Sequence, residues 1–211
     1  ISLNEPEGKC GPAGASAGDV NGDGYADVLA SAPYADAGHS NRGVTYLFSG
    51  ATLTGTVTTD NATASFAGEE DNLSLGTAIA ILPDTTNDGC DEIGVASHQL
   101  SMGATGRGGA YIFTGSTTIA GPIALSAAHA TIRGGADLDA LGNSIAAAGD
   151  INGDGTPDVI IGATSAPGGA NNGAVYLFSG ATLAGSIDAN ASTTLANITG
   201  MSGNDFLGSS V

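Results

Sequence analysis

Residues 18–28 read GDVNGDGYADV, and residues 149–159 read GDINGDGTPDV. Most positions of the two stretches are identical, and residues 84–93, DTTNDGCDEI, form a third and more divergent copy. The first Asp of each copy stands at position 19, 84 or 150, so the steps are 65 and 66 residues. Self-similarity at a fixed period is typical of repeat architectures. We therefore interpret the chain as three tandem copies of one structural unit.

Two further features keep the same period. An aromatic stretch, GVTYLFSG at residues 43–50, recurs at 109–115 and 173–180, and a Leu-Gly pair occurs at 75–76, 141–142 and 207–208. We expect residues 1–211 to form one β-propeller segment. Its repeats are expected at approximately 11–66, 75–132 and 141–198, with 206–211 starting a further blade.

The third copy indicates the secondary structure of one unit. Short apolar runs separated by Gly, Asn and Pro predict strands at 143–148, 158–163 and 174–179. A weaker fourth strand is expected near 186–189 or 194–198. Four short antiparallel strands at this period are typical of a propeller blade, with the strand rich in small residues innermost. The predicted fold class is therefore all-β, with about three four-stranded blades. A solenoid, the competing repeat fold, usually has shorter coils.

The composition excludes several function classes. The chain carries 21 Asp and Glu against 4 Lys and Arg, a net charge of −17, so it is unsuited to nucleic acid or to anionic membrane surfaces. No apolar run approaches the roughly 20 residues of a membrane span. Excess carboxylates suit metal cations, although a solvated acidic surface is the alternative interpretation.

The acidic loops follow the pattern D-x-N-x-D-G-x-x-D. Ca²⁺ takes six to eight oxygen ligands and tolerates irregular geometry. Side chains at positions 1, 3, 5 and 9, with the carbonyl of position 7, can converge when the backbone curls, and Gly at position 6 permits the turn. The predicted ligands of the first site are Asp19, Asn21, Asp23, the Tyr25 carbonyl and Asp27; those of the third are Asp150, Asn152, Asp154, the Thr156 carbonyl and Asp158.

The middle loop is a weaker candidate. Its predicted ligands are Asp84, Thr86, Asp88, the Cys90 carbonyl and Glu92, with Asp91 as a substitute if the loop shifts. An EF-hand is rejected because position 12 is Ala30 or Ile161 instead of an acidic residue. The remaining alternative for all three loops is a turn without metal.

These residues resemble the FG-GAP repeat of integrin α-subunit β-propellers and their bacterial relatives. The matching pieces are Phe206-Leu207-Gly208, the acidic loops, Ala32-Pro33 and the Tyr-Leu-Phe strand. The resemblance implies calcium held between the first and second strands of each blade, away from the ligand-binding face. The chain departs from the family pattern in its middle loop, in Ser97-His98 where Ala-Pro is usual, and in having only three blades.

Other motifs are given structural interpretations. Residues 14–18 match the G-x-S-x-G hydrolase motif, but that motif requires a helix after Ser16, where this chain has an acidic loop. Arg42 and Arg107 are interpreted as surface arginines that pair with carboxylates. Cys10 and Cys90 are expected at opposite ends of a strand, too far apart for a disulfide.

Two functions fit this pattern, and neither is enzymatic. We expect an extracellular calcium-binding module for adhesion or for binding an unknown protein or glycan, with structural calcium and no membrane insertion. The alternative is an accessory or scaffold domain of a larger secreted enzyme. Self-association, or further blades in the parent chain, would complete the propeller. No acid, base and nucleophile converge in the repeats, so we expect no catalysis by this segment.

Overall fold

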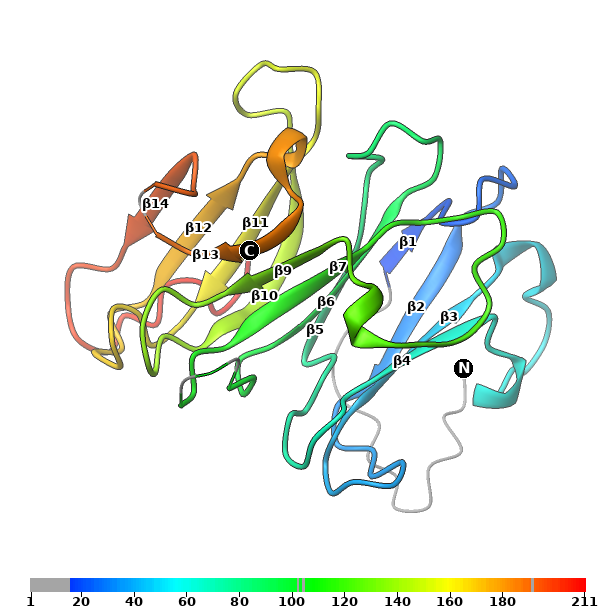
Figure 1. Ribbon diagram of the computed structural model, residues 1–211, viewed down its shortest axis with the longest axis horizontal. Helices are drawn as coiled ribbons and strands as arrows, with labels where there is room; N and C mark the ends of the chain where they lie inside the picture. Colours follow the sequence, from blue (N-terminus) through cyan, green and yellow to red (C-terminus); the bar gives the residue numbers. More distant parts are fainter. Residues whose placement is uncertain (1–15, 102, 104, 191) are drawn as a thin grey trace.

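The computed structural model describes residues 16–101, 103, 105–190 and 192–211. It is an all-β molecule in which three sheets stand side by side (Figure 1). No helix in the described part of the chain is long and apolar enough to cross a membrane. Short 3₁₀ turns complete the connections: η1 (Gly50–Thr52), η2 (Thr59–Asn61), η3 (Leu125–Ala127) and η4 (Gly180–Thr182).

Each sheet is built on four consecutive antiparallel neighbours, which we call a blade. Blade 1 contains β1 (Ser16–Gly18), β2 (Asp27–Ala32), β3 (Val44–Phe48) and β4 (Ala64–Ala67). Blade 2 contains β5 (Ala78–Leu82), β6 (Glu92–Ser97), β7 (Gly109–Phe113) and β9 (Ala130–Arg133). Blade 3 contains β10 (Leu141–Gly149), β11 (Asp158–Ala163), β12 (Ala174–Phe178) and β14 (Ala196–Thr199).

The four antiparallel strands predicted for a blade are present in all three, and the sheets of blades 1 and 2 contain a fifth strand that was not predicted. β8 (Gly121–Ile123) leaves blade 2 and pairs in parallel with β4, the outer strand of blade 1. β13 (Gly185–Asp188) leaves blade 3 and pairs in parallel with β9, the outer strand of blade 2. We call β8 and β13 strap strands. The two candidates for a fourth strand in the third copy both form, since 185–188 is a strap and 196–199 completes the blade.

The hydrophobic core lies between the blades. Leu29, Leu47 and Phe66 of blade 1 pack with Ile93 and Phe113 of blade 2, and the rings of Phe66 and Phe113 are 4.6 Å apart between centroids. A second cluster joins blade 2 to blade 3. Complete burial of one such side chain contributes about 1.5–3 kcal/mol. The two large clusters of buried apolar side chains therefore each join two successive blades.

The first strands of the blades lie innermost, as predicted. β1 and β10 both lie against β5, so the three first strands are neighbours in space. Their sequences are dominated by small residues, SAG in β1 and LGNSIAAAG in β10. Ala and Gly allow backbones to approach closely where the sheets converge. This arrangement is propeller-like, with the acidic loops following the first strands.

At the C-terminal end, Leu207 makes an isolated parallel bridge to Gly173. Gly108 makes the same bridge to Leu141, where β10 of the next blade begins. Leu207 thus occupies the place at which a blade starts. The prediction that 206–211 begins a further blade remains a prediction. The segment forms no strand in the structure, and it is joined to blade 3 by this bridge and by hydrogen bonds such as that from Ser144 Oγ to the Gly208 carbonyl (2.8 Å).

Candidate metal-binding loops

The three acidic loops lie together at one end of the molecule, between the first and second strands of their blades (Figure 1, top). We call residues 19–27 loop 1, residues 84–92 loop 2 and residues 150–158 loop 3. Each loop joins two antiparallel neighbours, so its ends are held by the sheet. The predicted position of the loops is thereby confirmed.

Loop 1 is curled by its own side chains. The Asp19 carboxylate accepts hydrogen bonds from the backbone N–H of Asp23 (3.0 Å) and of Gly24 (2.8 Å). Asn21 Oδ1 accepts from Asp23 N–H (2.9 Å), and Asp23 Oδ1 accepts from Tyr25 N–H (2.8 Å). Gly22 and Gly24 have φ of 70° and 85°, values that glycine adopts readily. The spacing of Asp, Asn and Gly therefore produces the curl that the sequence predicted.

Loop 3 repeats this geometry closely. Asp150 accepts from the N–H of Asp154 (3.1 Å) and of Gly155 (2.9 Å), and Asp154 accepts from Thr156 N–H (2.9 Å). Donation from Thr156 N–H is the main reason that the pKa of the exposed Asp154 carboxyl lies below its usual value. Asn152 Nδ2 donates to Asp154 (2.8 Å), so the side chains at positions 3 and 5 are in contact.

The acidic residue at position 9 is buried and holds the loop to the sheet. Asp27 and Asp158 are both 0% exposed. Asp27 accepts from Val20 N–H (3.0 Å) and from Gly50 N–H (3.0 Å). Burial raises the pKa of Asp27, and the two N–H donors oppose that rise. Asp158 accepts in the same way from Ile151 N–H (2.9 Å) and Gly180 N–H (3.1 Å).

Sequence analysis assigned no role to the Ser-Gly pair that follows the third strand. Gly50 and Gly180 supply the N–H donors to position 9, and Ser179 Oγ lies 3.3 Å from the Asp154 carboxylate. The pair recurs with the repeat period, which was the available signal for this role. The end of the third strand therefore contacts the loop of its own blade in blades 1 and 3.

Loop 2 uses a different anchor. Glu92 replaces Asp at position 9, is 0% exposed, and accepts from Thr85 N–H (2.7 Å) and Thr86 N–H (3.1 Å). Burial raises its pKa. Asp84 still accepts from Asp88 N–H (3.1 Å) and Gly89 N–H (2.8 Å). The curl thus survives in the divergent copy, with the longer Glu side chain reaching two N–H groups of the loop itself.

Asp91 links loops 1 and 2. One of its carboxylate oxygens accepts from Asp84 N–H (3.1 Å) and the other from Asp19 N–H (2.8 Å). Its own N–H donates to the Asp19 carbonyl (2.9 Å). The sequence placed Asp91 as a substitute ligand of the second site. In the structure Asp91 connects two blades, because loop 2 of blade 2 lies against loop 1 of blade 1.

The loops present the oxygen chemistry that hard cations prefer, but their side chains are not gathered around a point. In the described residues, no three His, Cys, Asp or Glu side chains form a group that could hold a metal ion. The carboxylates instead accept backbone N–H groups. Cys90, in loop 2, is a buried free cysteine, and burial is the main reason that its pKa is raised. The prediction that Cys10 and Cys90 form no disulfide stays a prediction, because Cys10 lies outside the described residues.

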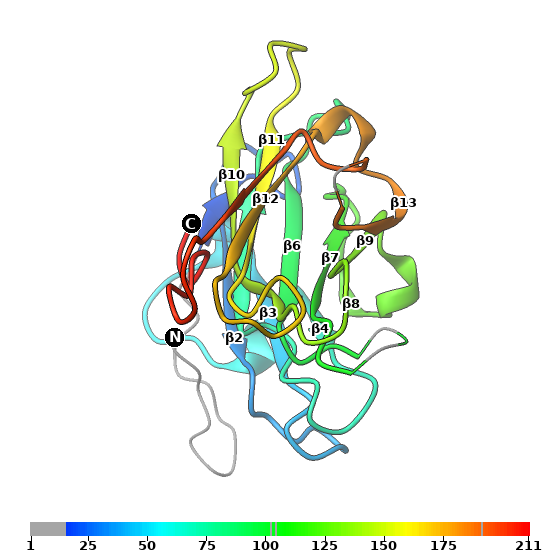
Figure 2. The same ribbon diagram turned by 90° about the vertical axis from the view of Figure 1, so that its left-hand side faces the viewer.

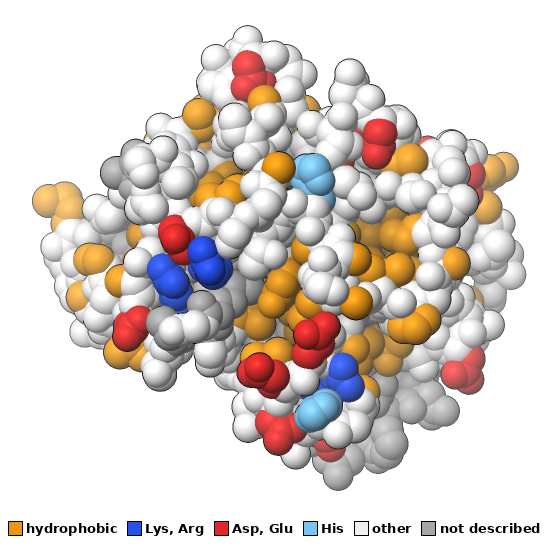
Figure 3. Space-filling view, viewed as in Figure 1, with side chains coloured by type: hydrophobic (Ala, Val, Ile, Leu, Met, Phe, Trp, Pro, Cys, Tyr) orange, Lys and Arg blue, Asp and Glu red, His pale blue; other side chains and the backbone are white. Residues whose placement is uncertain are grey.

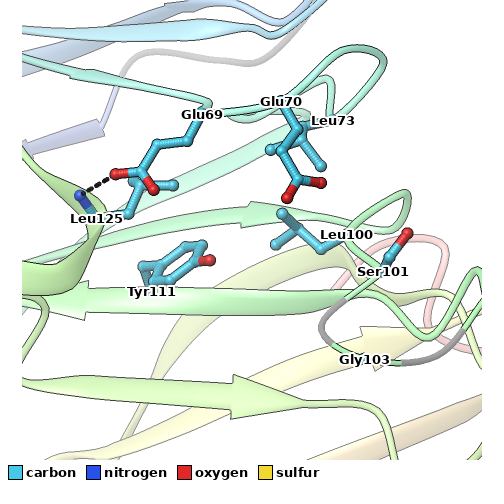
Figure 4. A pocket seen from close by; sticks show the side chains of 8 residues that line it. All are labelled: Glu69, Glu70, Leu73, Leu100, Ser101, Gly103, Tyr111 and Leu125. Atoms are coloured by element: carbon cyan, nitrogen blue, oxygen red, sulfur yellow. Dashed lines mark hydrogen bonds between the residues drawn. The ribbon is translucent and has the colours of Figure 1, made fainter.

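Two hollows lie at the opposite end, each between neighbouring blades. One, of about 580 Å³, is lined by His98, Leu138 and Asn171 among others. The other, of about 220 Å³, has Glu69 and Glu70 on one side and Tyr111 and Leu100 on the other (Figure 4). Glu69 also accepts from Leu125 N–H (3.3 Å). Figure 3 shows apolar side chains across the middle of the molecular face seen in Figure 1, with acidic groups below them.

The predicted surface arginines brace the outer strands. Arg42 Nε donates to the carbonyl of Gly68, and Arg107 Nε donates to that of Gly134, at equivalent places in blades 1 and 2. Arg107 also lies 3.3 Å from the Asp188 carboxylate on strap β13, as the expected pairing with a carboxylate. Both arginines are therefore structural side chains at the end of the molecule away from the loops.

Comparison with known proteins identifies the repeat. The FG-GAP repeat family matches residues 11–48 and 141–178. The chain is 34% identical over 174 residues to the phosphatidylinositol-glycan-specific phospholipase D of Homo sapiens, covering 79% of this chain and 20% of that protein. The Bos taurus protein of the same name is 34% identical over 158 residues, or 72% of this chain and 18% of the relative. The chain spans about a fifth of the length of these relatives.

Proposed function

This chain is an FG-GAP repeat protein, and from that premise we propose that it is an extracellular propeller module whose acidic loops bind structural calcium. The observation that carries the proposal is the shared curl of loops 1 and 3. Three carboxylates and one amide stand within nine residues of each loop, and none of the nine is basic. Carboxylate, amide and carbonyl oxygens are the ligands that Ca²⁺ prefers.

Calcium would act on folding through charge. Asp19, Asp23 and Asp27 stand within nine residues, and the negative charge of Asp23 adds to the rise in the pKa of Asp27. Repulsion among the carboxylates of the loop opposes the folded state when no cation is present. A cation bound only to the folded state stabilises it by about 2.7 kcal/mol at a hundredfold excess over Kd. Loop 2, with Thr86 and Glu92 at positions 3 and 9, is proposed as the weakest of the three sites. Extracellular calcium is millimolar, and extracellular modules bind with Kd of about 10⁻⁴–10⁻³ M.

The test is a thermal melt in excess CaCl₂ and again in EDTA, with MgCl₂ as the control for ionic strength and divalent charge. We expect the melting temperature to rise substantially with calcium and much less with magnesium. If the loops are turns that bind no metal, the same hydrogen bonds within each loop hold them, and the melting temperature does not depend on calcium. Equal melting temperatures under all three conditions would therefore assign the loops as turns and refute the calcium proposal.

A substitution in loop 3 separates metal binding from loop structure. Asp154 is exposed and accepts hydrogen bonds from Thr156 N–H and Asn152 Nδ2 of its own loop, and at 3.3 Å from the Ser179 hydroxyl. We expect Asp154→Ala to lower the melting temperature in calcium and to change the free energy of unfolding in EDTA by no more than about 0.5 kcal/mol. Asp60→Ala, at an exposed acidic residue outside the loops, should have no effect in either condition. Equal losses in calcium and EDTA for Asp154→Ala would contradict the linkage.

We propose the end opposite the loops as the partner-binding surface, for adhesion or for a protein or glycan ligand. Loops between strands, carried by rigid sheets, commonly hold binding residues. This end also has the two interblade hollows, one of which combines Glu69 and Glu70 with an apolar wall. Variants of this end should lose the binding of a partner while keeping the calcium-dependent melt of the parent chain.

The second candidate function is a scaffold segment within a larger secreted enzyme. It is favoured by the relatives, whose printed name is that of a phospholipase and of which this chain spans about a fifth. Expression of the complete gene product, with and without this segment, would test it. Loss of folding or substrate access in the truncated enzyme supports the scaffold role, while full activity without the segment favours an independent binding module.

A further inference from the structure

Asn is followed directly by Gly at three places in the chain. These pairs are Asn21-Gly22 in loop 1, Asn152-Gly153 in loop 3 and Asn172-Gly173 just before β12. In such a pair the backbone nitrogen of Gly can attack the side-chain carbonyl carbon of Asn, because Gly has no Cβ to hinder the approach. Water then opens the resulting ring, and the Asn becomes Asp or isoAsp. The residue types are the same in all three pairs, so differences in their reactivity come from the surrounding structure.

The N–H group of the Gly is held differently in the three pairs. Gly22 is exposed, and its N–H makes no hydrogen bond with any of the described residues. Gly153 N–H donates to the Asp150 carboxylate at 2.7 Å. Gly173 is buried, and its N–H donates to the Ala166 carbonyl at 2.9 Å. A nitrogen whose N–H is hydrogen-bonded must be released before it can attack, so the Gly22 nitrogen is the most free to react.

The side chain of Asn21 is also set up for the attack. Its Oδ1 accepts from Asp23 N–H (2.9 Å), and negative charge develops on this oxygen when the carbonyl is attacked. A backbone N–H aimed at such an oxygen stabilises the developing charge. Asn152 Oδ1 has the same donor, Asp154 N–H (2.8 Å), but Asn152 Nδ2 is held by the Asp154 carboxylate at 2.8 Å. The contacts of Asn21 Nδ2 are longer, such as that to Asp27 Oδ1 (3.4 Å), so the Asn21 amide is activated at its oxygen and weakly held at its nitrogen.

Exposure alone predicts a different order of reactivity. Loop 3 extends beyond the ends of β10 and β11, and Figure 2 shows it projecting at the top of the molecule. A Cβ on Gly153 would meet nothing within 4 Å, whereas a Cβ on Gly22 would lie 3.3 Å from Cys90 Sγ in loop 2. Asn152 is exposed and Asn21 is half-buried. If access to water governed the reaction, Asn152 would react first, whereas the hydrogen bonds favour Asn21.

We propose that Asn21-Gly22 is a modification site, at which the folded chain converts Asn21 to Asp and isoAsp faster than either other pair reacts. The Gly22 nitrogen bonds to the side-chain carbon of Asn21, and its proton passes through solvent to the departing nitrogen. The C–N bond of the side-chain amide breaks, and ammonia leaves. Water then adds to one of the two ring carbonyls. One ring opening gives Asp, and the other gives isoAsp, in which the main chain runs through the former side chain.

The modification changes loop 1 alone among the three acidic loops. Asp at position 3 adds one negative charge to the loop. IsoAsp lengthens the backbone by one carbon at the place where Gly22 lies against Cys90 of loop 2. Loop 2 has Thr86 at position 3 and therefore has no Asn-Gly pair, and loop 3 keeps its amide for longer.

The experiment follows the three pairs in the 211-residue chain, folded in mildly alkaline buffer with EDTA and unfolded in the same buffer with urea. Peptide mass spectrometry detects the change from amide to carboxylate, and isoaspartyl methyltransferase labels isoAsp. In urea the three pairs should react alike. In the folded chain we expect Asn152 to react about tenfold more slowly than Asn21, because a hydrogen bond to a charged group must break. Asn172 should react more than about a hundredfold more slowly than Asn21, because part of blade 3 must open.

Asp150→Asn is the matched control for this mechanism. The new amide keeps an acceptor for Gly153 N–H but removes the charge, and a hydrogen bond to a neutral acceptor is weaker. Asn152 should then react several-fold faster, while the rate at Asn21 stays the same. The proposal is overturned if Asn152 or Asn172 reacts as fast as Asn21 in the folded chain. It is also overturned if Asn21 stays intact in the folded chain for as long as Asn172 does. Because EDTA is present throughout, neither outcome depends on calcium binding.

Discussion

At the scale of single residues, the Asp at position 9 of loops 1 and 3 anchors its loop to the sheet. Asp27 and Asp158 are fully buried, yet each carboxylate accepts two backbone N–H groups, one from its own loop and one from the end of the third strand. A buried carboxylate needs such donors to offset its desolvation. The pattern D-x-N-x-D-G-x-x-D therefore encodes an anchored loop as well as the oxygen-bearing side chains that we propose as calcium ligands.

Tyr111 provides a test of charge at the residue scale. Its pKa is raised, first by burial and then by the negative charges of Glu69 and Glu70, which stand on the other side of the hollow (Figure 4). Changing both glutamates to glutamine removes those charges but not the burial. We expect the pKa of Tyr111 to fall part of the way toward its usual value of about 10.

Phenolate absorbance during an alkaline titration measures this shift. Tyr176 is the internal control, since its pKa is raised by burial and by Asp139 and should not respond to the double variant. An unchanged Tyr111 titration would mean that the two carboxylates lie away from the hollow in solution.

At the scale of elements, the blades are joined through glycine. Gly43 and Gly108 have φ of 78° and 72°, and a Cβ at either position would meet the backbone of the Leu that starts the next blade, Leu75 or Leu141. The Gly that precedes the third strand of one blade therefore makes a close backbone contact with the Leu-Gly pair at the start of the next blade. Each blade must keep both for its neighbour to dock.

Gly108→Ala should therefore be more damaging than its backbone angle alone predicts. Gly55 also has positive φ, 64°, but a Cβ there meets nothing within 4 Å. We expect Gly55→Ala to cost about 1–2 kcal/mol of unfolding free energy from backbone strain, and Gly108→Ala to cost about 1–3 kcal/mol more from overpacking against Leu141. Urea unfolding of both variants measures the difference, and equal losses would show that the blades can separate slightly at this contact.

Strap β13 is joined to blade 2 by side chains as well as by backbone pairing. Asp188 on β13 lies 3.3 Å from Arg107 and 3.1 Å from Arg133, and all three side chains are partly exposed. We expect Asp188→Asn to cost about 1 kcal/mol or less and to speed hydrogen exchange in β13. Strap β8 lacks an acidic residue, so its exchange is the internal reference. Unchanged exchange in β13 would mean that pairing with β9 alone holds the strap.

For the whole molecule, the repeat period determined most of what could be predicted. The strand at 158–163 was predicted with the bounds that the structure has, because it is a continuous apolar run between an acidic turn and a Gly-rich one. The straps were not predicted as such. GSID and GPI are short and largely exposed, and their partners lie in another blade, so no local pattern reveals the pairing.

In the candidate metal-binding loops, too, local features could be predicted from the sequence and contacts between blades could not. The sequence places the oxygen-bearing side chains and the curl of each loop, since both follow from local spacing. It does not reveal that Asp91 bridges two loops or that Gly50 and Gly180 complete them, because these contacts join residues of different strands and blades. Sequence periodicity therefore predicts each blade better than it predicts how blades are joined.

The last prediction compares Ile132 on β9 with Ile198 on β14, which occupy the third position of the outer strands of blades 2 and 3. Ile132→Ala removes a fully buried side chain from the interface of blades 2 and 3 and should cost about 2–5 kcal/mol. Ile198→Ala removes a side chain that is 62% exposed, and since little apolar surface is lost from the core it should cost less than about 1 kcal/mol. Denaturant unfolding of the two variants at low protein concentration gives both values. A loss at Ile198 as large as that at Ile132 would mean that the face of blade 3 that carries Ile198 is already covered in solution, and that the 211-residue chain does not expose it as a free surface.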